Sequence, residues 1–214
     1  MLGLTPSIII SHIFVLLIAF PIHEFAHAWT ADRFGDSTPR LNGRLTLNPL
    51  AHLDPMGSLL ILVANFGWAK PVPVNPYVLA RRSPAALMWV SLAGPLSNLL
   101  MAVIAAIPFQ LGLVTAAQAQ LDMLTGSSRF LPTIPQLLWV FISINLVLML
   151  FNLIPLFPLD GEKIAAYFFP PSWVRFLDVI RPYSPLILLA LAFLGAFGVI
   201  LTPTLNVLMR FLVG

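Results

Sequence analysis

Long apolar runs separated by short polar segments dominate the chain. Four runs reach about 20 residues, the length of helix that crosses the hydrocarbon core of a bilayer. They cover roughly residues 7–31, 85–114, 132–156 and 185–212. A fifth run, residues 56–66, is shorter, and we expect it to re-enter the membrane or lie along its surface. The pattern predicts an all-α integral membrane bundle of about four transmembrane helices with one re-entrant segment.

Two stretches between the first two spans have a period of two instead. The segments "GRLTLNP" (43–49) and "GWAKPVPVNP" (67–76) place apolar residues at alternate positions, as a half-buried strand does. Proline lacks the N–H that a central strand needs but is accepted on the edge of a sheet. We therefore expect a small membrane-associated β-sheet at the cytoplasmic surface. An ordinary proline-rich interfacial loop is the alternative.

Composition supports a membrane protein and indicates its orientation. Hydrophobic residues make up 59% of the 214 and charged residues only 9%, against about 25% in soluble domains. The net charge of +3 does not indicate nucleic-acid binding, because the eleven Lys and Arg residues are scattered between apolar runs. Nine of them fall in the loops 32–84 and 157–184, and only Arg129 falls in the loop 115–131. This asymmetry predicts that the two basic loops face the cytoplasm and that both termini lie outside.

The segment "HEFAH" places His23, Glu24 and His27 inside the first predicted span. Residues four apart share one face of a helix, so both imidazoles can present a nitrogen atom to one ion. The carboxylate beside the first histidine can then act as general base on water, as in zinc peptidases with this motif. The alternative is a pair of buried histidines satisfied by neighbouring helices, and lipid makes such idle polar groups expensive.

A third metal ligand is harder to find from spacing. A catalytic zinc ion usually takes three protein ligands, and the chain has no cysteine. His12 lies three helical turns from His23, and His52 lies in the long loop, so a carboxylate has to be considered. Asp160 follows the third predicted span on the side of the membrane where the first span ends. Its position fits a metal ligand and a helix-terminal turn residue equally well.

These motifs, together with "SLAGPLSN" (91–98) and "FNLIPLFPLDG" (151–161), resemble the site-2 protease family of intramembrane zinc metalloproteases. The resemblance covers most of the chain and is to the small, single-domain branch found in prokaryotes. It implies that His23, His27 and Asp160 bind zinc and that Glu24 activates water. It also implies that Asn152, which opens the NxxPxPxLDG motif, contacts the substrate carbonyl or the developing oxyanion. Phe157 departs from the motif by occupying its second proline position.

Two asparagines near these motifs could have a structural role instead of a role in the reaction. Pro155 and Pro158 leave backbone carbonyls without partners, which at membrane depth is tolerated only inside protein or beside a water-filled cavity. Asn152 at this break could serve the reaction, or it could join helices by hydrogen bonding. For Asn98, four residues after Gly94, we expect helix packing rather than support of the zinc face.

We therefore expect a single domain over residues 1–214, with no PDZ insertion and no CBS domain. It is expected to bind one Zn²⁺ per chain and to act as a metalloendopeptidase in regulated intramembrane proteolysis. It would cut a peptide bond within or near a transmembrane segment, on the cytoplasmic side of a prokaryotic cell membrane. Its expected partners are a membrane-protein substrate and the lipid bilayer, with a homo-oligomer left open.

The loop 32–84 is expected to hold the re-entrant segment and the sheet, whose free edge could pair with an extended substrate. The expected substrate contacts are Trp68, Lys70, Pro71, Val72, Pro73 and Val74. A transporter or channel for a divalent metal that uses the same His/Asp cluster is the alternative function. An inactive relative is disfavoured, because every proposed catalytic position is filled.

Overall fold

The computed structural model describes the chain apart from residues 1–4, 55–56, 58–69 and 126–129. Its elements, in chain order, are α1 (Pro6–Arg33), α2 (Thr38–Leu41), α3 (Pro49–His52), α5 (Pro76–Arg82), α6 (Ala86–Gln110), α7 (Ala116–Thr125), α8 (Ile134–Asn152), α9 (Asp160–Phe168), α10 (Pro171–Ile180), η2 (Arg181–Tyr183), α11 (Ser184–Phe193) and α12 (Ala196–Val213).

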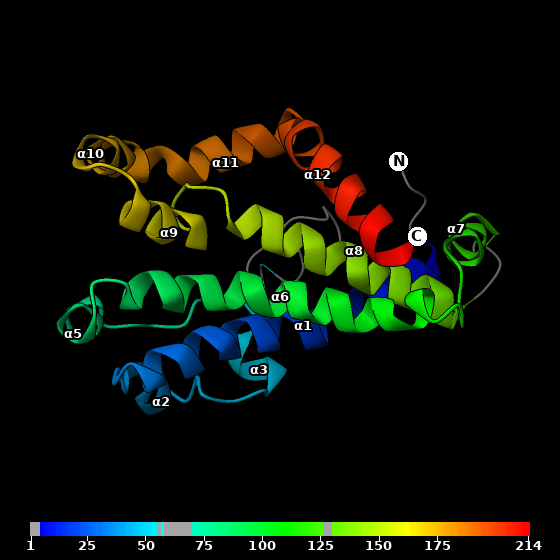
Figure 1. Ribbon diagram of the computed structural model, residues 1–214, viewed down its shortest axis with the longest axis horizontal. Coiled ribbons are helices and arrows are strands. Elements are labelled where there is room, and N and C mark those ends of the chain that lie inside the picture. Colours follow the sequence, from blue (N-terminus) through cyan, green and yellow to red (C-terminus); the bar gives the residue numbers. More distant parts are fainter. Residues whose placement is uncertain (1–4, 55–56, 58–69, 126–129) are drawn as a thin grey trace.

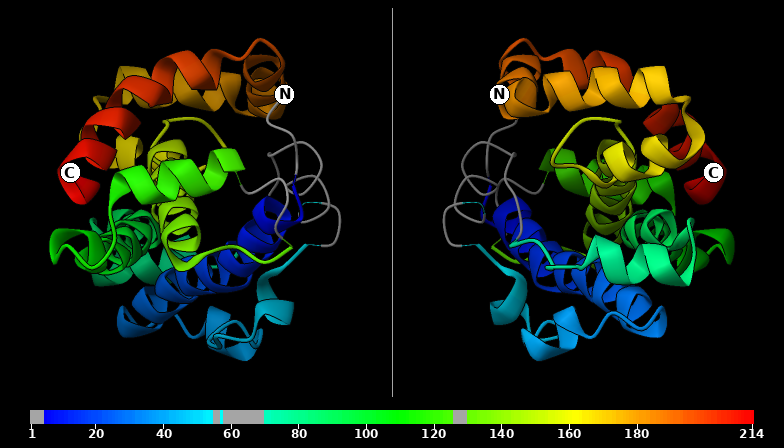
Figure 2. Two further views of the ribbon diagram at one scale, coloured as in Figure 1. Left: turned by 90° about the vertical axis from the view of Figure 1, so that its right-hand side faces the viewer. Right: turned by 90° about the vertical axis from the view of Figure 1, so that its left-hand side faces the viewer.

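The helices α1, α6 and α8 run along the long axis of the molecule, and α6 contacts both of the others (Figure 1). The helices α10 to α12 lie along one side of this group (Figure 2). Where α6, α8 and α12 meet, the buried residues include Ala102, Ala106, Leu146 and Leu212. Small side chains allow helix backbones to approach closely, which matters in lipid because no hydrophobic effect drives helices together there.

Local sequence explains where the long helices begin and end. Thr5 and Thr133 are the N-cap residues of α1 and α8, and each hydroxyl accepts a hydrogen bond from a backbone N–H of the first turn. Proline stands in the first turn of both helices, where its missing N–H costs nothing. The helix α8 ends at Asn152, just before Pro155, and an irregular turn over residues 153–159 leads into α9.

The expected β-sheet is wrong: no β-strand occurs in the part of the chain that the structure describes. Residues 44–48 and 70–75 are irregular. They are joined by the buried side chain of Arg44, whose Nη1 donates to the carbonyls of Ala51 at 2.5 Å and Lys70 at 3.2 Å. Alternation of apolar residues predicted the sheet incorrectly, because an extended segment held by a side chain has the same pattern as a strand.

The described residues contain five helical stretches that are long and apolar enough to cross a membrane, against about four predicted. Three of them are α1, α6 and α8, close to the predicted positions. The fourth predicted span, residues 185–212, is divided between α11 and α12 by Gly195, whose φ is 68°. Glycine adopts this left-handed conformation without steric cost, so it ends α11 although both flanks are apolar. The chain is thus an all-α integral membrane protein, and the predicted segment 56–66 lies outside the described residues apart from Gly57.

Candidate metal centre

The second half of α1 carries the two histidines of the HExxH motif. His23 and His27 lie one turn apart, both are buried, and their Nε2 atoms are 3.0 Å from each other. Glu24 is buried beside them. The helical period therefore brings both rings to one face of α1, as the spacing predicted.

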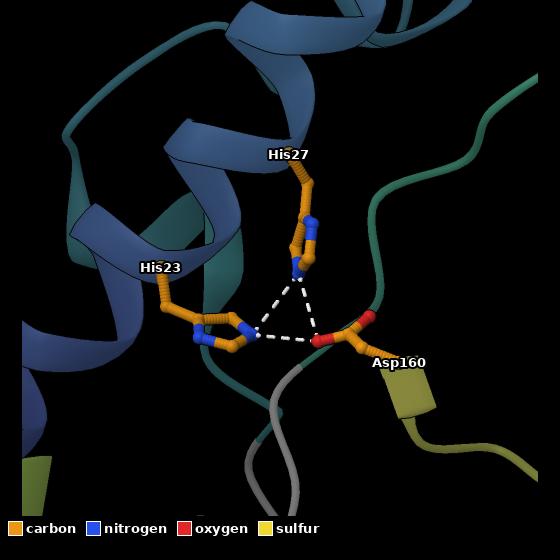
Figure 3. Close-up of side chains that lie close together, drawn as sticks. All are labelled: His23, His27 and Asp160. Carbon is orange, nitrogen blue, oxygen red and sulfur yellow. Dashed lines mark hydrogen bonds and ion pairs between the residues drawn. The ribbon is translucent and has the colours of Figure 1, made fainter. Parts of the chain in front are cut away.

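Asp160 reaches the two histidines from a different part of the chain. It is the first residue of α9, and its Oδ2 lies 3.3 Å from His23 Nε2 and 3.2 Å from His27 Nε2 (Figure 3). Gly161 makes this approach possible, because a Cβ at that position would overlap the backbone of Leu153. The structure thus brings together the three residues that the resemblance implied as metal ligands.

Hydrogen bonds from α6 hold both imidazoles in place. His27 Nδ1 donates to the carbonyl of Val90 at 2.7 Å, and His23 Nδ1 is 2.5 Å from Asn98 Oδ1, to which it donates. Asn98 Nδ2 in turn donates to Asn145 Oδ1 on α8 at 2.9 Å. With each Nδ1 carrying the proton, each Nε2 keeps its lone pair for a ligand.

This network corrects the expectation that Asn98 serves only helix packing, and it includes Asn145, which the sequence analysis missed. Asn145 is fully buried in the apolar helix α8 and donates to the carbonyl of Phe141 at 2.9 Å. Its presence in an apolar span was the available signal, because amide side chains inside membranes are usually engaged in specific hydrogen bonds.

The donor set of the cluster fits a metal ion. His23, His27 and Asp160 form the group of potential metal ligands found among the described residues. Their three ligand atoms are separated by 3.0 to 3.3 Å. Ligands about 2.1 Å from a tetrahedral zinc ion are about 3.4 Å apart. Two imidazoles and one carboxylate are a known zinc donor set that leaves the fourth position open.

A cavity of about 880 Å³ opens beside the cluster. Its lining is mostly apolar and includes Glu24, Asn152 and residues of α8 and α11. Glu24 Oε2 accepts a hydrogen bond from the N–H of Val72 at 3.2 Å. Asn152 Nδ2 donates to the carbonyl of Leu148 at 3.0 Å. The proposed base and the proposed oxyanion donor therefore border the same space as the metal-ligand cluster.

The other candidates from the sequence are placed differently. Of the expected substrate contacts, Pro71, Val72 and Val74 line the cavity, whereas Trp68 lies outside the described residues. Lys70 and Pro73 are exposed. His12 Nδ1 bonds to the carbonyl of Ile8, and His52 Nε2 bonds to the carbonyl of Thr46. Neither histidine belongs to the metal-ligand group, as their sequence positions indicated.

The chain was compared with known proteins. YwhC of Bacillus subtilis (strain 168), named as a candidate zinc metalloprotease, is 42% identical over 205 residues, which cover 96% of this chain and 88% of YwhC. Two proteins named Rip2, also candidate zinc metalloproteases, match as well. The protein of Mycolicibacterium smegmatis is 40% identical over 43% of this chain and 39% of its own length. The protein of Mycobacterium tuberculosis (strain H37Rv) is 30% identical over 89% of this chain and 66% of its own length. No solved structure matches the chain.

A family model described as peptidase family M50 matches residues 11–191. The match confirms the resemblance drawn from the motifs and favours a peptidase over a metal transporter. The matched segment covers most of the chain and contains His23, His27 and Asp160. The chain therefore belongs to peptidase family M50 and is a metalloendopeptidase.

Proposed function

We propose that this peptidase uses one Zn²⁺ per chain to hydrolyse a peptide bond within or near the transmembrane segment of a membrane-protein substrate. The observation that carries the proposal is the convergence of His23, His27 and Asp160 beside a large, mostly apolar cavity inside a membrane protein. The relatives named as candidate zinc metalloproteases support zinc as the ion. A buried polar cluster in an apolar bundle is costly, which favours a functional role.

Four side chains would serve metal binding and proton transfer. His23, His27 and Asp160 would hold the ion, which when bound supplies a Lewis acid that polarises the scissile carbonyl. Glu24 takes a proton from the attacking water and later returns it to the leaving amine. Its bond from the N–H of Val72 keeps the carboxylate on the cavity wall without occupying both oxygens.

Asn152 stabilises the charge that develops on the substrate oxygen. Its amide group lies where α8 ends and now donates to the carbonyl of Leu148. Rotation of the side chain toward the cavity exchanges this bond for one to the oxyanion. The exchange preserves one hydrogen bond for the amide, so the donor is available at little cost.

The substrate has to be extended at the cut site, because a helical peptide bond is shielded by its own hydrogen bonds. Residues 71–74 are irregular and form one wall of the cavity through Pro71, Val72 and Val74. We place the unwound substrate along this segment. Specificity would then rest on the apolar surface of the two valines and on the backbone groups between the prolines.

We further propose that the metal centre faces the cytoplasmic leaflet of a prokaryotic cell membrane. The helices α2, α5, α9 and α10 lie at one end of the bundle, and α12 ends at the other (Figure 1). The loops at the first end carry most of the basic residues. Cleavage there would release a cytoplasmic fragment of the substrate, as regulated intramembrane proteolysis requires.

Glu24→Gln tests the mechanism. The variant should keep stoichiometric zinc by elemental analysis and lose cleavage of a model transmembrane substrate in proteoliposomes. Asp32→Asn is the matched control, because Asp32 is an acidic residue of the same helix, lies outside the cavity lining and pairs with Arg40 at the protein surface. It should keep most of the activity.

His23→Ala and Asp160→Ala complete the test, since both should lose zinc together with activity. Cleavage at the normal rate by Glu24→Gln would disprove the assigned base. Full zinc content in both ligand variants would disprove the metal centre. Uptake of metal into the same vesicles without peptide cleavage would favour the transporter instead.

A further inference from the structure

The helix α10 is amphipathic, and none of its residues is buried. Trp173, Phe176, Leu177 and Ile180 follow one another at helical spacing and share one face. The two aromatic side chains are 55% and 51% exposed. Such a face is costly in water and needs a covering.

The direction of α10 differs from that of the spanning helices. Figure 1 shows α10 nearly end-on, whereas α1, α6 and α8 run along the long axis. Figure 2 shows α10 lengthwise across that axis. If the bundle crosses the bilayer along its long axis, α10 lies in the plane of the membrane.

The length of α10 also excludes a crossing. Its ten residues extend about 15 Å at 1.5 Å per residue, half of the roughly 30 Å hydrocarbon core. Hydropathy alone groups Pro171–Phe193 into one candidate span. The 3₁₀ turn η2 separates α10 from α11, so the two helices do not form one straight rod.

The apolar surface continues from α10 onto α11. Leu186 on that helix and Leu194 directly after it are 66% and 80% exposed, and neither lines the cavity beside the metal centre. On a membrane-embedded helix these side chains face lipid, so the apolar face of α10 adjoins a lipid-exposed surface. Trp and Phe side chains favour the boundary between headgroups and acyl chains.

An ion pair links the end of α10 to the helix that carries Asp160. Arg181, directly after α10, forms an ion pair with the buried carboxylate of Glu162 on α9 and lies 5.7 Å from the ring centroid of Phe157. Glu162 belongs to the first turn of α9, which Asp160 begins. The position of α10 is thereby coupled to the position of a metal-ligand candidate.

We propose that α10 is an interfacial helix whose apolar face inserts into the headgroup–acyl boundary of the leaflet nearer the metal centre. Through Arg181 and Glu162 it sets the depth of Asp160, and so of the cut site, relative to the membrane surface. Arg175 and Asp178 on the polar face have opposite charges. Insertion therefore depends on apolar contact and does not need anionic lipid.

Spin labelling tests this directly, because the chain contains no cysteine. Single variants Trp173→Cys, Phe176→Cys, Arg175→Cys and Asp178→Cys are labelled with a nitroxide in phosphatidylcholine vesicles. All four positions are exposed, so the labels need not disturb the fold. Accessibility to oxygen and to a water-soluble nickel chelate then gives the depth of each label. Leu100→Cys, near the middle of α6 and 60% exposed, is the control for a position within the hydrocarbon.

Labels at 173 and 176 should lie roughly 5–10 Å below the headgroups, with high oxygen and low nickel accessibility. Labels at 175 and 178 should show the reverse. Depth that increases steadily along α10 would mean a transmembrane helix and would overturn the proposal. So would nickel accessibility at all four positions, or protection of the aromatic positions from both reagents by a protein partner. Insertion that requires added phosphatidylglycerol would overturn the claim of independence from lipid charge.

Discussion

Gly94 on α6 lies against both imidazoles, and Gly94→Ala therefore tests the packing of the metal centre. A Cβ at this position would overlap His27 Nε2 and would lie 2.6 Å from His23 Cε1. The rings cannot easily turn aside, because each is held at Nδ1, by Val90 and by Asn98. Ordinary van der Waals contact begins near 3.4 Å, so the contact to His23 alone requires a displacement of about 0.8 Å.

The size of the effect follows from this displacement. Either α6 moves away or the rings rotate. Both changes move the two Nε2 atoms away from the point where they would bind a metal ion together with Asp160. A shift of about 1 Å at a reacting group lowers the rate roughly 10²-fold. This corresponds to a loss of about 2.7 kcal/mol of transition-state stabilisation. Disturbed ligand orientation also weakens metal binding about 10–100-fold. Overpacking costs only about 1–3 kcal/mol of stability, so the fold should persist.

Gly198→Ala in α12 is the matched control, because no described atom lies within 4 Å of a Cβ at Gly198. It should leave zinc content and cleavage unchanged and should stabilise the helix by roughly 0.5–1 kcal/mol. Zinc per chain, cleavage of a model transmembrane substrate and thermal unfolding are measured for both variants in one detergent. Stoichiometric zinc and wild-type cleavage in Gly94→Ala would refute the close packing of α6 against the histidines.

Three further substitutions test neighbouring contacts. Asn98→Ala removes the acceptor of the His23 proton and should weaken zinc binding about 10–100-fold; an unchanged affinity in a chelator competition would contradict this role. Arg181→Gln leaves the buried Glu162 unpaired and should destabilise the fold by about 1–3 kcal/mol. The double variant with Glu162→Gln should recover most of that loss in the same thermal unfolding assay, and failure to recover would exclude the ion pair as the cause. Asn152→Ala should lower kcat about 10²–10³-fold with little change in KM, and a change confined to KM would indicate a binding role instead.

Features with a local physical cause could be predicted from the sequence. The apolar runs located α1, α6 and α8, because the bilayer sets a minimum length for a spanning helix. The spacing within "HEFAH" placed His23 and His27 on one face, because the helical period is a property of neighbouring residues. Asp160 was different: spacing left its role open, and only the resemblance to a family singled it out.

Features that depend on contacts between distant segments required the tertiary structure. The alternating pattern around Arg44 predicted a sheet, yet a guanidinium contact joins the two segments as loops. The role of Asn98 appeared only when α6 was seen beside α1 and α8, where His23 and Asn145 lie within hydrogen-bonding distance. The length of the apolar runs determines which segments enter the membrane, because burial in lipid is not directional. Polar contacts inside the bundle are short and directional, so only the packing of the helices decides which of them form.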